Sequence, residues 1–365
     1  MDRLPRLLVL IGSGELAAQM TRGHRMLVER LIGGRGRAAD VKVRAAIIDT
    51  PYGFQSNADA LSATLLDYFG RRIGMDASIA SLRRSDDDVV ARETAYERVR
   101  EAEFVFSGPG SPSYALRHWK ESRLPELMSE KLHDGGALVF ASAAALTLGR
   151  LTVPVYEIYK GGSDPYWLDG LDVLSTIGIS AAVIPHYDNT EGTGHDTRFC
   201  FLGERRLAAL EEKLPSDVFV LGIDEHTAML VDIDEGKAFV HGRGDVTIRS
   251  RGESDVIASG ETFDLSRLTR PEARATEGTA RLDSIDADDS ASLARRLLAL
   301  EDRSASLDQR ARLAEPLVES LLALRQQARE TGDFATADDI RKRLIHLGVE
   351  VTDEADGTTR FRLPD

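Results

Sequence analysis

Cysteine is almost absent from this chain of 365 residues, which contains one, Cys200. A disulfide bond within the chain is therefore excluded, and the cysteine content gives no support for secretion. Cys200 stands between two phenylalanines, so we expect a buried residue rather than a catalyst. The sequence also lacks a recognisable signal peptide and an apolar run long enough to cross a bilayer. We expect a soluble, cytoplasmic protein.

Basic residues are in deficit, with 46 Lys and Arg against 60 Asp and Glu, and the formal net charge is -14. A broad phosphate-binding surface needs clustered cations and is disfavoured, although a local basic strip remains compatible with this balance. Nucleotide-binding glycine motifs are also lacking. The turn at 12–14 is only part of a dinucleotide fingerprint, and there is no P-loop. We expect no cofactor.

Short apolar runs, each followed by a polar turn, dominate the first two thirds of the chain. They are residues 7–11, 45–48, 104–106, 138–140, 182–184 and 218–221. Continuous apolar runs are typical of strands buried on both faces of a parallel sheet. Their alternation with helix-like stretches predicts an α/β fold with a doubly wound, mostly parallel sheet. Ligands bind beyond the carboxyl ends of the strands in such folds, which is where the polar turns stand.

The composition divides the chain into three parts. Residues 1–266 carry the α/β pattern and end in an antiparallel hairpin with its turn at 234–237. Residues 267–308 are polar and read as a linker that contains a helix near 293–300. Residues 309–365 have two stretches of helical periodicity, then alternation around Asp356-Gly357, which predicts a helical hairpin followed by a β-hairpin. A unit this small is expected to dock on a partner or on the main domain.

The functional interpretation of this chain depends on whether Ser142 is a nucleophile. It stands between the run that ends at Ala141 and a series of small helix-forming residues, a pattern that predicts strand, sharp turn and helix. That arrangement holds a nucleophile above the end of a sheet. The usual elbow is Gly-x-Ser-x-Gly, and here Phe140 and Ala144 replace the glycines that relieve strain. The alternative is a buried serine in an ordinary strand-to-helix connection.

A serine hydroxyl is a poor nucleophile until an imidazole takes its proton, and His186 is the candidate base. It follows the predicted strand 182–184, which brings it to the same sheet edge as Ser142. Two carboxylates compete to orient the imidazole. Glu225 follows the next strand along the chain, and Asp188 stands two residues beyond the histidine, on the same side if the chain is extended.

A second glycine-rich turn, at 107–111, can approach a substrate closely because glycine has no side chain. The backbone amides of Gly110 and Ala143 are therefore candidate oxyanion-hole donors, and the alternative is an ordinary strand-to-helix turn. The candidate substrate-binding residues stand in or near this turn or directly after the histidine: Gly108, Tyr114, Tyr187 and Asn189.

Metal binding is the competing interpretation of the polar segment 186–198. Its potential donors are His186, Asp188, Glu191, His195 and Asp196. Their spacing matches no established ligand pattern. We therefore predict a hydrogen-bonded loop without a metal, in which Asp196 or Thr197 caps the following helix.

Together these segments resemble the dipeptidase E and cyanophycinase family of serine peptidases, which have a class I glutamine amidotransferase-like fold. The resemblance spans most of residues 5–250. It rests on the turn at 108–110 followed by Tyr114, the elbow at 142, Pro185-His186, and residues 222–228. The last segment is similar to the family signature Gly-Ile-Asp-Glu-x-Thr-Ala and is the most specific of the four.

This resemblance implies that Ser142 is the nucleophile, His186 the base and Glu225 the third member of a triad. It further implies hydrolysis of an amide or peptide bond in a small substrate, without a cofactor. The family elbow is usually Gly-Thr-Ser-Ala-Gly, and an Arg-rich stretch tends to follow the base; this chain departs from both patterns. Amidotransferases carry cysteine in the elbow, so a glutaminase is disfavoured.

The C-terminal part, residues 316–363, resembles the small tail domain of cysteinyl-tRNA synthetases, also found in YqeB-type proteins. The matching residues are Arg325, Ala328-Arg329, Asp333-Phe334, Ala337-Asp338, Ile340-Arg341, Leu344, Leu347-Gly348 and Asp356-Gly357-Thr358. In synthetases the tail assists tRNA recognition, which implies a contact with tRNA or a protein here, whereas aminoacylation is not implied. The basic residues of this tail could instead form salt bridges with its many acids.

Two functional hypotheses follow from the sequence. The first is a serine hydrolase of the dipeptidase E type. The second is a catalytically inactive module that keeps the ligand pocket, with the tail contacting tRNA or a protein. The exposed sheet edges and the small tail also favour a homodimer.

Overall fold

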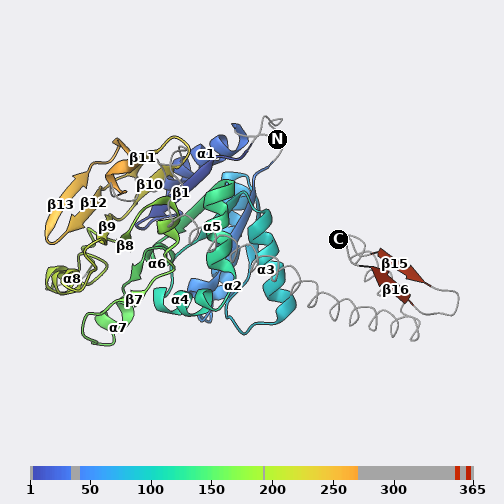
Figure 1. Ribbon diagram of the computed structural model, residues 1–365, viewed down its shortest axis with the longest axis horizontal. Helices are drawn as coiled ribbons and strands as arrows, with labels where there is room; N and C mark the ends of the chain where they lie inside the picture. Colours follow the sequence, from blue (N-terminus) through green and yellow to red (C-terminus); the bar gives the residue numbers. More distant parts are fainter. Residues whose placement is uncertain (1–2, 34–41, 192–193, 270–349, 354–358, 363–365) are drawn as a thin grey trace, which may run out of the picture. The chain divides into compact units, whose positions relative to one another are not determined.

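The computed structural model describes residues 3–33, 42–191, 194–269, 350–353 and 359–362. The chain divides into two compact units, residues 1–279 and 280–365. The first unit is built on an eight-stranded sheet with the order β14-β11-β10-β1-β5-β4-β2-β3 (Figure 1). The predicted α/β fold with a mostly parallel central sheet is confirmed.

Five strands of this sheet run parallel. They are β1 (Arg6–Ile11), β2 (Arg44–Ile48), β3 (Asp76–Ala80), β4 (Phe104–Ser107) and β5 (Gly136–Ala141). Three antiparallel strands extend the sheet beyond β1: β10 (Thr227–Asp232), β11 (Lys237–Gly242) and β14 (Thr262–Asp264). The predicted hairpin is the β10–β11 pair, with its turn at 233–236.

The remaining two predicted strands lie in a second sheet of four strands. Its order is β13-β12-β9-β8, and β8 and β9 are parallel to each other. The bounds are β8 (Ala181–Ile184), β9 (Phe219–Ile223), β12 (Val246–Ser250) and β13 (Glu253–Ile257). A short pair, β6 (Leu151–Thr152) and β7 (Leu168–Asp169), forms a separate antiparallel bridge.

Helices connect the strands and cover both faces of the main sheet (Figure 1). They are α1 (Ala18–Gly33), α2 (Ala58–Asp67), α3 (Val89–Glu101), α4 (Pro112–Lys120), α5 (Leu124–Asp134), α6 (Ala143–Thr147), α7 (Val155–Tyr159) and α8 (Gly203–Glu211). Short π or 3-10 turns are η1 (Thr50–Tyr52), η2 (Tyr68–Ile73), η3 (Val173–Ile177) and η4 (Leu265–Arg267). None of the helices in these described residues is long and apolar enough to span a bilayer.

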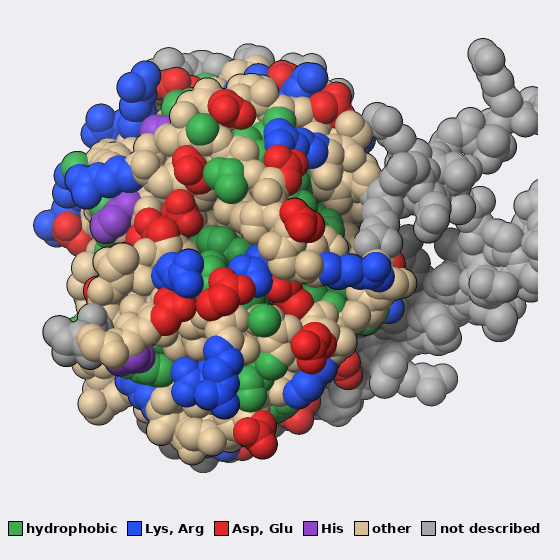
Figure 2. All heavy atoms as spheres, turned by 90° about the vertical axis from the view of Figure 1, so that its left-hand side faces the viewer, with side chains coloured by type: hydrophobic (Ala, Val, Ile, Leu, Met, Phe, Trp, Pro, Cys, Tyr) green, Lys and Arg blue, Asp and Glu red, His purple; other side chains and the backbone are tan. Residues whose placement is uncertain are grey.

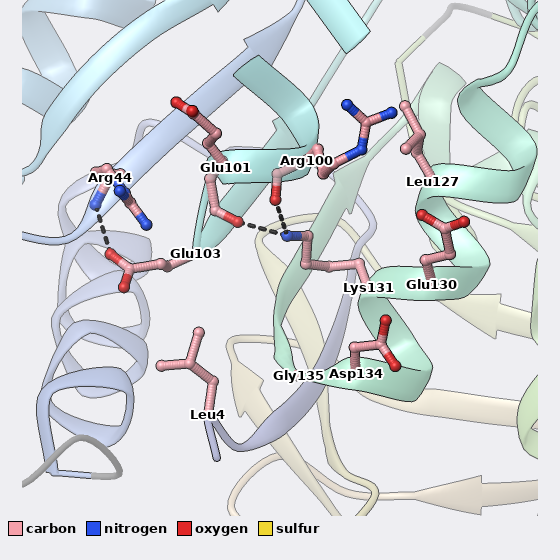
Figure 3. A pocket seen from close by; sticks show the side chains of 11 residues that line it. Leu4, Arg44, Arg100, Glu101, Glu103, Leu127, Glu130, Lys131, Asp134 and Gly135 are labelled. Carbon is pink, nitrogen blue, oxygen red and sulfur yellow. Dashed lines mark hydrogen bonds between the residues drawn. The ribbon is translucent and has the colours of Figure 1, made fainter. Parts of the chain in front are cut away.

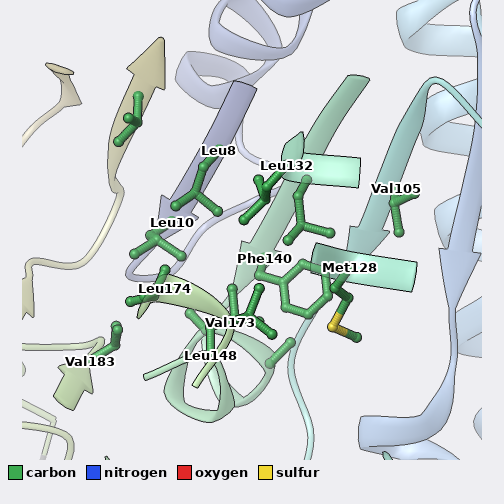
Figure 4. Packing of buried hydrophobic residues seen from close by; sticks show 14 of the residues in the cluster. Leu8, Leu10, Val105, Met128, Leu132, Phe140, Leu148, Val173, Leu174 and Val183 are labelled. Carbon is green, nitrogen blue, oxygen red and sulfur yellow. The ribbon is translucent and has the colours of Figure 1, made fainter. Parts of the chain in front are cut away.

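Alternate residues of each parallel strand enter two different cores, which explains the continuous apolar runs in the sequence. Leu8, Leu10 and Phe140 pack with side chains from α3, α4 and α5 on one face (Figure 4). Val9 and Val139 pack with α1 and α2 on the other face. Full burial of a large apolar side chain contributes about 1.5–3 kcal/mol relative to exposure, so a one-residue slip of a strand is strongly disfavoured.

The register of these strands sets the positions of the turns beyond them. Ile11 of β1 pairs with Ala141 of β5, so the turn after β1 begins beside Ser142. In the second sheet Ile184 pairs with Gly222, which brings the segments after β8 and β9 together. At the carboxyl side of the strands, the turn after β1 therefore lies beside the turn after β5. The turn after β8 likewise lies beside the turn after β9.

The described part of the first unit continues to Thr269, which forms a bridge with Ile179, and Leu268 is buried. It thus runs three residues into the segment predicted as a linker. In the second unit β15 (Glu350–Asp353) pairs antiparallel with β16 (Thr359–Arg362), which is the predicted β-hairpin. The predicted helix near 293–300 and the helical hairpin lie outside the described residues, and the three-part division stays a prediction.

Candidate active site

Ser142 lies in a sharp turn between β5 and α6, as the sequence pattern predicts. Its backbone has φ 49° and ψ -120°, a conformation that L-residues adopt rarely and that costs about 1–3 kcal/mol. The hydroxyl makes no capping hydrogen bond to α6, although a serine at that position commonly does. The side chain is partly buried, and its oxygen is directed to another partner.

The turn forms without glycine at either flanking position. Phe140 and Ala144 are both fully buried. The Phe140 ring packs against Trp119, with 5.8 Å between ring centroids, and the Ala144 N–H donates to the carbonyl oxygen of Gly108 at 3.3 Å. The Ser142 N–H is held as well, by the carbonyl oxygen of Ile11 at 3.0 Å. These contacts hold the strained backbone where the usual elbow relies on glycine.

His186 joins the serine to a carboxylate. Its Nε2 lies 2.9 Å from Ser142 Oγ, and its Nδ1 lies 2.8 Å from Oε1 of Glu225. The histidine and glutamate side chains are 22% and 25% exposed, so the pair is reachable from solvent yet largely shielded. The three groups come from the carboxyl ends of β5, β8 and β9, and form one continuous hydrogen-bonded chain.

Glu225 and Asp188, the two candidate acids for orienting His186, have different hydrogen-bond partners. Asp188 is exposed, and its Oδ1 accepts a hydrogen bond of 2.6 Å from the backbone N–H of Glu225. Within the described residues, no hydrogen bond joins Asp188 to His186. Glu225 is therefore the acid that contacts the imidazole, and Asp188 fixes the backbone of that acid.

Further bonds anchor the segment around Glu225. The carboxylate of Asp224 accepts from the Asp245 N–H at 2.7 Å, and burial raises the pKa of Asp224 to about 6. The His226 N–H donates to Ser13 Oγ at 3.1 Å, and Thr227 Oγ1 accepts from the Gly244 N–H at 2.8 Å. This anchoring gives a structural reason for a conspicuous run of polar residues at 224–227.

The glycine-rich turn after β4 packs against the start of α6 through the Gly108 carbonyl. Gly110 has φ 149°, and a Cβ at this position would lie 2.0 Å from the carbonyl oxygen of Pro51, so only glycine fits. Ala143 is the first residue of α6, where a backbone N–H has no partner within the helix. The two candidate oxyanion donors thus come from turns that are joined by the bond from the Ala144 N–H to the Gly108 carbonyl.

The four candidate substrate residues lie in different surroundings. Gly108 is buried in the turn just described. The Tyr114 hydroxyl donates to the Arg83 carbonyl at 3.0 Å, and its ring lies 4.5 Å from that of His118. Tyr114 is partly buried and stays at the rim of the glycine-rich turn.

Tyr187 and Asn189 are buried inside the loop that carries His186. The Tyr187 ring packs edge-on against Phe199 at 4.5 Å and covers Gly222, and burial raises the pKa of its phenol to about 12. The Asn189 amide donates to the Thr197 carbonyl at 3.2 Å. Both side chains hold the loop, and their burial gives no support for the predicted contact with substrate.

A turn of three residues that the sequence did not reveal supports His186. Phe199, Cys200 and Phe201 all have positive φ, between 55° and 66°. Such a backbone costs roughly 1–2 kcal/mol per residue. The Cys200 N–H donates to the His186 carbonyl at 3.0 Å, which ties this turn to the base. Cys200 is buried as predicted, and burial raises the pKa of its thiol to about 12, so the thiol stays protonated.

The polar loop after the base is held by hydrogen bonds. In residues 3–33, 42–191 and 194–269, no group of three or more His, Cys, Asp or Glu side chains is placed to hold a metal ion. Asp196 pairs with Arg198, which lowers the pKa of that carboxyl. Its Oδ2, which also accepts from Arg198, accepts from the Glu204 N–H at 2.9 Å, in the first turn of α8. Asp196 thus caps the following helix, as predicted.

One acid at this edge was not singled out from the sequence. Glu15, in the turn after β1, is partly buried. Burial raises the pKa of its carboxyl, and a backbone hydrogen bond together with the neighbouring His186 and His226 opposes that shift. The signal was available, because Gly12-Ser13-Gly14-Glu15 is a polar turn after the first apolar run, at the same edge as the other turns.

A pocket lies at the opposite end of the main sheet (Figure 3). Its volume is about 270 Å³, and its lining includes residues at the amino ends of β2, β4 and β5. Lys131 donates from Nζ to the carbonyl oxygens of Arg100 at 3.1 Å and Ala102 at 2.5 Å. Burial lowers the pKa of this ammonium to about 8. Lysine near the last carbonyls of a helix is a common end cap, here for α3.

Charge is mixed on the face that Figure 2 presents, which is the left-hand side of Figure 1. Lys and Arg side chains alternate there with Asp and Glu. Among the described residues, ion pairs join Arg198 with Asp196, Arg267 with Asp255 and Lys237 with Asp264. This face has no broad basic surface among the described residues, in keeping with the acidic composition.

The two units of the chain are similar to different known proteins. The chain is similar to the crystal structure of a peptidase from an acI-B1 Actinobacterium, with TM-score 0.57 and 20% identity, covering 72% of this chain and 98% of that one. This likeness establishes the fold of the first unit. Residues 311–362 match the Cysteinyl-tRNA ligase anticodon binding domain family.

Two curated relatives are cysteine–tRNA ligases. The ligase of Maridesulfovibrio salexigens is 58% identical over 40 residues, which is 11% of this chain and 8% of the ligase. The ligase of Haloarcula marismortui is 49% identical over 51 residues, or 14% of this chain and 10% of the ligase. The chain therefore spans a small fraction of the length of these relatives, and the similarity concerns its C-terminal region.

Proposed function

We propose that this chain, whose first unit has a peptidase fold, is a serine hydrolase that cleaves an amide or peptide bond of a small substrate. One observation carries the proposal: Glu225, His186 and Ser142 form a hydrogen-bonded chain with contacts of 2.8 and 2.9 Å at the carboxyl edge of the strands. A nucleophile, a base and an orienting acid in that order are what acyl transfer requires.

In the proposed reaction, Ser142 Oγ attacks the substrate carbonyl carbon while His186 Nε2 takes the hydroxyl proton. Glu225 holds the imidazole through Nδ1 and stabilises the imidazolium that forms. The C–N bond then breaks, the amine leaves with the proton from Nε2, and an ester to the serine remains. Water, deprotonated by the same imidazole, attacks this ester and releases the acid.

The backbone amides of Gly110 and Ala143 are the proposed donors to the oxyanion of the tetrahedral intermediate. Preorganised amides cost no reorganisation when the charge develops, and losing one such donor lowers kcat by about 10²–10³-fold. The strained backbone at Ser142 serves the same end, because it holds the hydroxyl in an attacking position without a capping bond to α6.

A fluorophosphonate reagent tests the proposal directly. It reacts with activated serines, and mass spectrometry then locates the adduct. We expect labelling at Ser142 in the wild type, none at that position in Ser142→Ala, and strongly reduced labelling in His186→Ala. A folded wild type that resists the reagent would leave the alternative, an inactive fold that binds a ligand.

We further propose that the C-terminal region contacts tRNA, because residues 311–362 match an anticodon-binding domain. Filter binding of total tRNA to the full chain at several salt concentrations tests this, since phosphate contacts make affinity fall steeply with salt. Replacing Arg325 and Arg329 by Glu is expected to weaken binding more than tenfold. Equal retention by both proteins would favour a protein partner instead.

We also propose that the protein is cytoplasmic and forms a homodimer. Analytical sedimentation of the full chain tests the homodimer.

A further inference from the structure

Arg249 of β12 is a buried cation that the proposed mechanism does not use. Its side chain is 7% exposed, and three of its nitrogens donate to carboxylates on α8. Nε donates to Glu211 at 2.8 Å, and Nη1 and Nη2 donate to the two oxygens of Glu204 at 3.1 and 2.5 Å. A bidentate pair of this kind fixes the orientation of the guanidinium plane as well as its position. The side chain of Arg249 therefore joins β12 to α8 in one defined geometry.

The guanidinium of Arg249 also lies over the ring of Phe199. Its Cζ is 5.4 Å from the centroid of that ring, which is buried and packs edge-on against Tyr187 at 4.5 Å. A cation is attracted by the negative face of an aromatic ring, and the attraction is strongest where water is excluded. Arg249 thus ties the Phe199 ring to β12 and α8.

Phe199 begins the turn that is bonded to the loop of the base. Its φ is 60°, and Cys200 and Phe201 continue in the left-handed conformation. The Phe199 N–H donates to the Tyr187 carbonyl at 2.8 Å, and the Cys200 N–H donates to the His186 carbonyl at 3.0 Å. The backbone of His186 has positive φ as well. Two strained stretches of backbone therefore hold each other through these two bonds.

Neither stretch contains a glycine that would adopt this conformation without strain. A left-handed backbone at a residue with a side chain persists only where the surrounding structure fixes it. Arg198 also lies over the Phe199 ring, at 4.9 Å, but its side chain is 50% exposed, whereas that of Arg249 is buried. Exposed charged contacts contribute little, so Arg249 is the stronger anchor of the two.

The strand of Arg249 is also the neighbour of the strand that leads to the acid of the triad. Arg249 pairs with Val220 of β9, and Glu225 stands two residues beyond the end of β9 at Ile223. The same pair of strands therefore positions both partners of the serine. It positions Glu225 directly, and it positions His186 through the turn 199–201.

We propose that Arg249 is a positioning residue for His186. By holding the Phe199 ring to β12 and α8, it keeps the turn 199–201 in its left-handed conformation. The turn then keeps the imidazole at hydrogen-bond distance from Ser142 and Glu225. The inference rests on the proposed hydrolase function. It concerns the geometry of the triad and not the binding of a substrate, so loss of the anchor should lower kcat and leave KM unchanged.

Arg249→Lys tests the inference, because it keeps the charge and removes the geometry. A compact ammonium cannot reproduce the planar fork of the guanidinium or its stacking on a ring. With a chromogenic anilide that the wild type cleaves, we expect kcat to fall tenfold or more and KM to stay within twofold. The reason is that a misplacement of about 1 Å can cost about 10²-fold in rate.

Arg267→Lys is the matched control. Arg267 also pairs with an acid, Asp255, and its guanidinium also lies over a phenylalanine ring, that of Phe263 at 6.0 Å. Its partners belong to β13 and β14 and not to the loop of the base. Arg267→Lys should therefore keep the wild-type kcat and KM.

A purely structural role of Arg249 would have different consequences. The Glu211 side chain is 6% exposed, so a weaker ion pair lowers stability whatever the role of the turn. In that case Arg249→Lys would lower the melting temperature, and the folded variant would keep the wild-type kcat. Phe199→Leu separates the two roles, because it removes the ring and leaves both ion pairs of Arg249 in place. It should lower kcat as Arg249→Lys does, and the double variant should be no slower than the slower single variant.

Hydrogen exchange of the full chain, read by mass spectrometry, tests the inference without any turnover. The N–H groups of Phe199 and Cys200 are those bonded to the loop of the base. We expect both to exchange at least tenfold faster in Arg249→Lys and in Phe199→Leu, while the amides of β5 keep their wild-type rates. A general loss of stability would instead accelerate exchange in all of these segments.

Three results would overturn the inference. They are a folded Arg249→Lys variant with the wild-type kcat, losses in kcat that are additive in the double variant, and unchanged exchange at Phe199 and Cys200. Should Arg249→Lys fail to fold, Phe199→Leu replaces it in both measurements, and wild-type kcat or exchange would again overturn the inference. If the wild type cleaves no anilide, the hydrolase proposal fails by itself, and the exchange rates still decide whether Arg249 holds the turn.

Discussion

The two ends of the main sheet both hold charged groups with shifted pKa values, yet they differ in kind. At the amino end, Lys131 lines a pocket, but its ammonium is satisfied by two helix carbonyls, and the positive φ angles there fall on Gly135 and Gly136. At the carboxyl end, positive φ falls not only on glycines but also on Ser142, His186 and His226.

The comparison distinguishes the charged pocket at the amino end from the candidate active site at the carboxyl end. A buried lysine that caps a helix is a structural feature, however strongly its pKa is shifted. Backbone strain at two residues whose side chains bond each other, Ser142 and His186, has no structural benefit of its own. The following predictions test whether the carboxyl end alone carries the chemistry.

The largest effect is expected for Ser142→Ala. If the carboxyl end is the active site, kcat/KM for a cleaved amide should fall about 10⁴-fold or more, because the other triad members cannot act without the nucleophile. Steady-state hydrolysis with a chromogenic anilide measures this. The melting temperature should change little, because alanine keeps the Cβ and therefore the same backbone at the turn. Retained turnover would move the chemistry elsewhere.

Glu225→Gln should come next, with a fall in kcat of about 10³-fold. The amide can still contact His186 Nδ1, but it has no charge to stabilise the imidazolium and favours the wrong tautomer. Pre-steady-state kinetics with an activated ester report the acylation rate. Substrate affinity should change little, and a parallel loss of affinity would argue for a binding role instead.

Asp188→Asn should have a smaller effect, about tenfold on kcat. Asparagine can still accept the 2.6 Å bond from the Glu225 N–H, but the bond loses its charge. Asp188→Ala removes the acceptor and should cost more than Asp188→Asn. If Asp188→Asn instead matched Glu225→Gln in severity, then the assignment of the two acids would be reversed.

The smallest effect on catalysis is expected at the amino end. Lys131→Met should leave kcat/KM within twofold of wild type. The buried ammonium has a pKa of about 8, below the 10.5 of an exposed lysine, so the unfolded state binds more protons between these values. Stability of the wild type relative to Lys131→Met should therefore rise as pH increases from about 8 to 10.5. Urea unfolding at pH 7, 9 and 10 measures this, and a flat difference would contradict it.

Sequence reasoning found the strands whose side chains are apolar on both faces. Residues 7–11 and 138–140 could be read directly, because each position enters a core. It missed β13, whose residues Glu253–Asp255 are polar and exposed on an edge of the second sheet. It also did not foresee that β8 and β9 leave the main sheet, since a buried run says nothing about which strand it pairs with.

The candidate site was foreseen to a similar degree. Ser142, His186 and Glu225 could be named because each follows an apolar run at the same sheet edge. Which of Glu225 and Asp188 bonds the imidazole depends on the backbone of the loop, where His186 and the turn 199–201 all have positive φ. Phe199, Cys200 and Phe201 give no sign of that conformation, because glycine, its usual marker, comes only at 203.

The pairing of β1 has a consequence for synthesis of the chain on the ribosome. β1 lies between β5 and β10, whose residues are made roughly 130 and 220 positions later. One edge of the first strand therefore waits unpaired until most of the first unit has emerged, and exposed strand edges invite wrong pairings. The turn after β1 bonds to His226 and Thr227, so it cannot be seated before that time and is among the last parts of this unit to form.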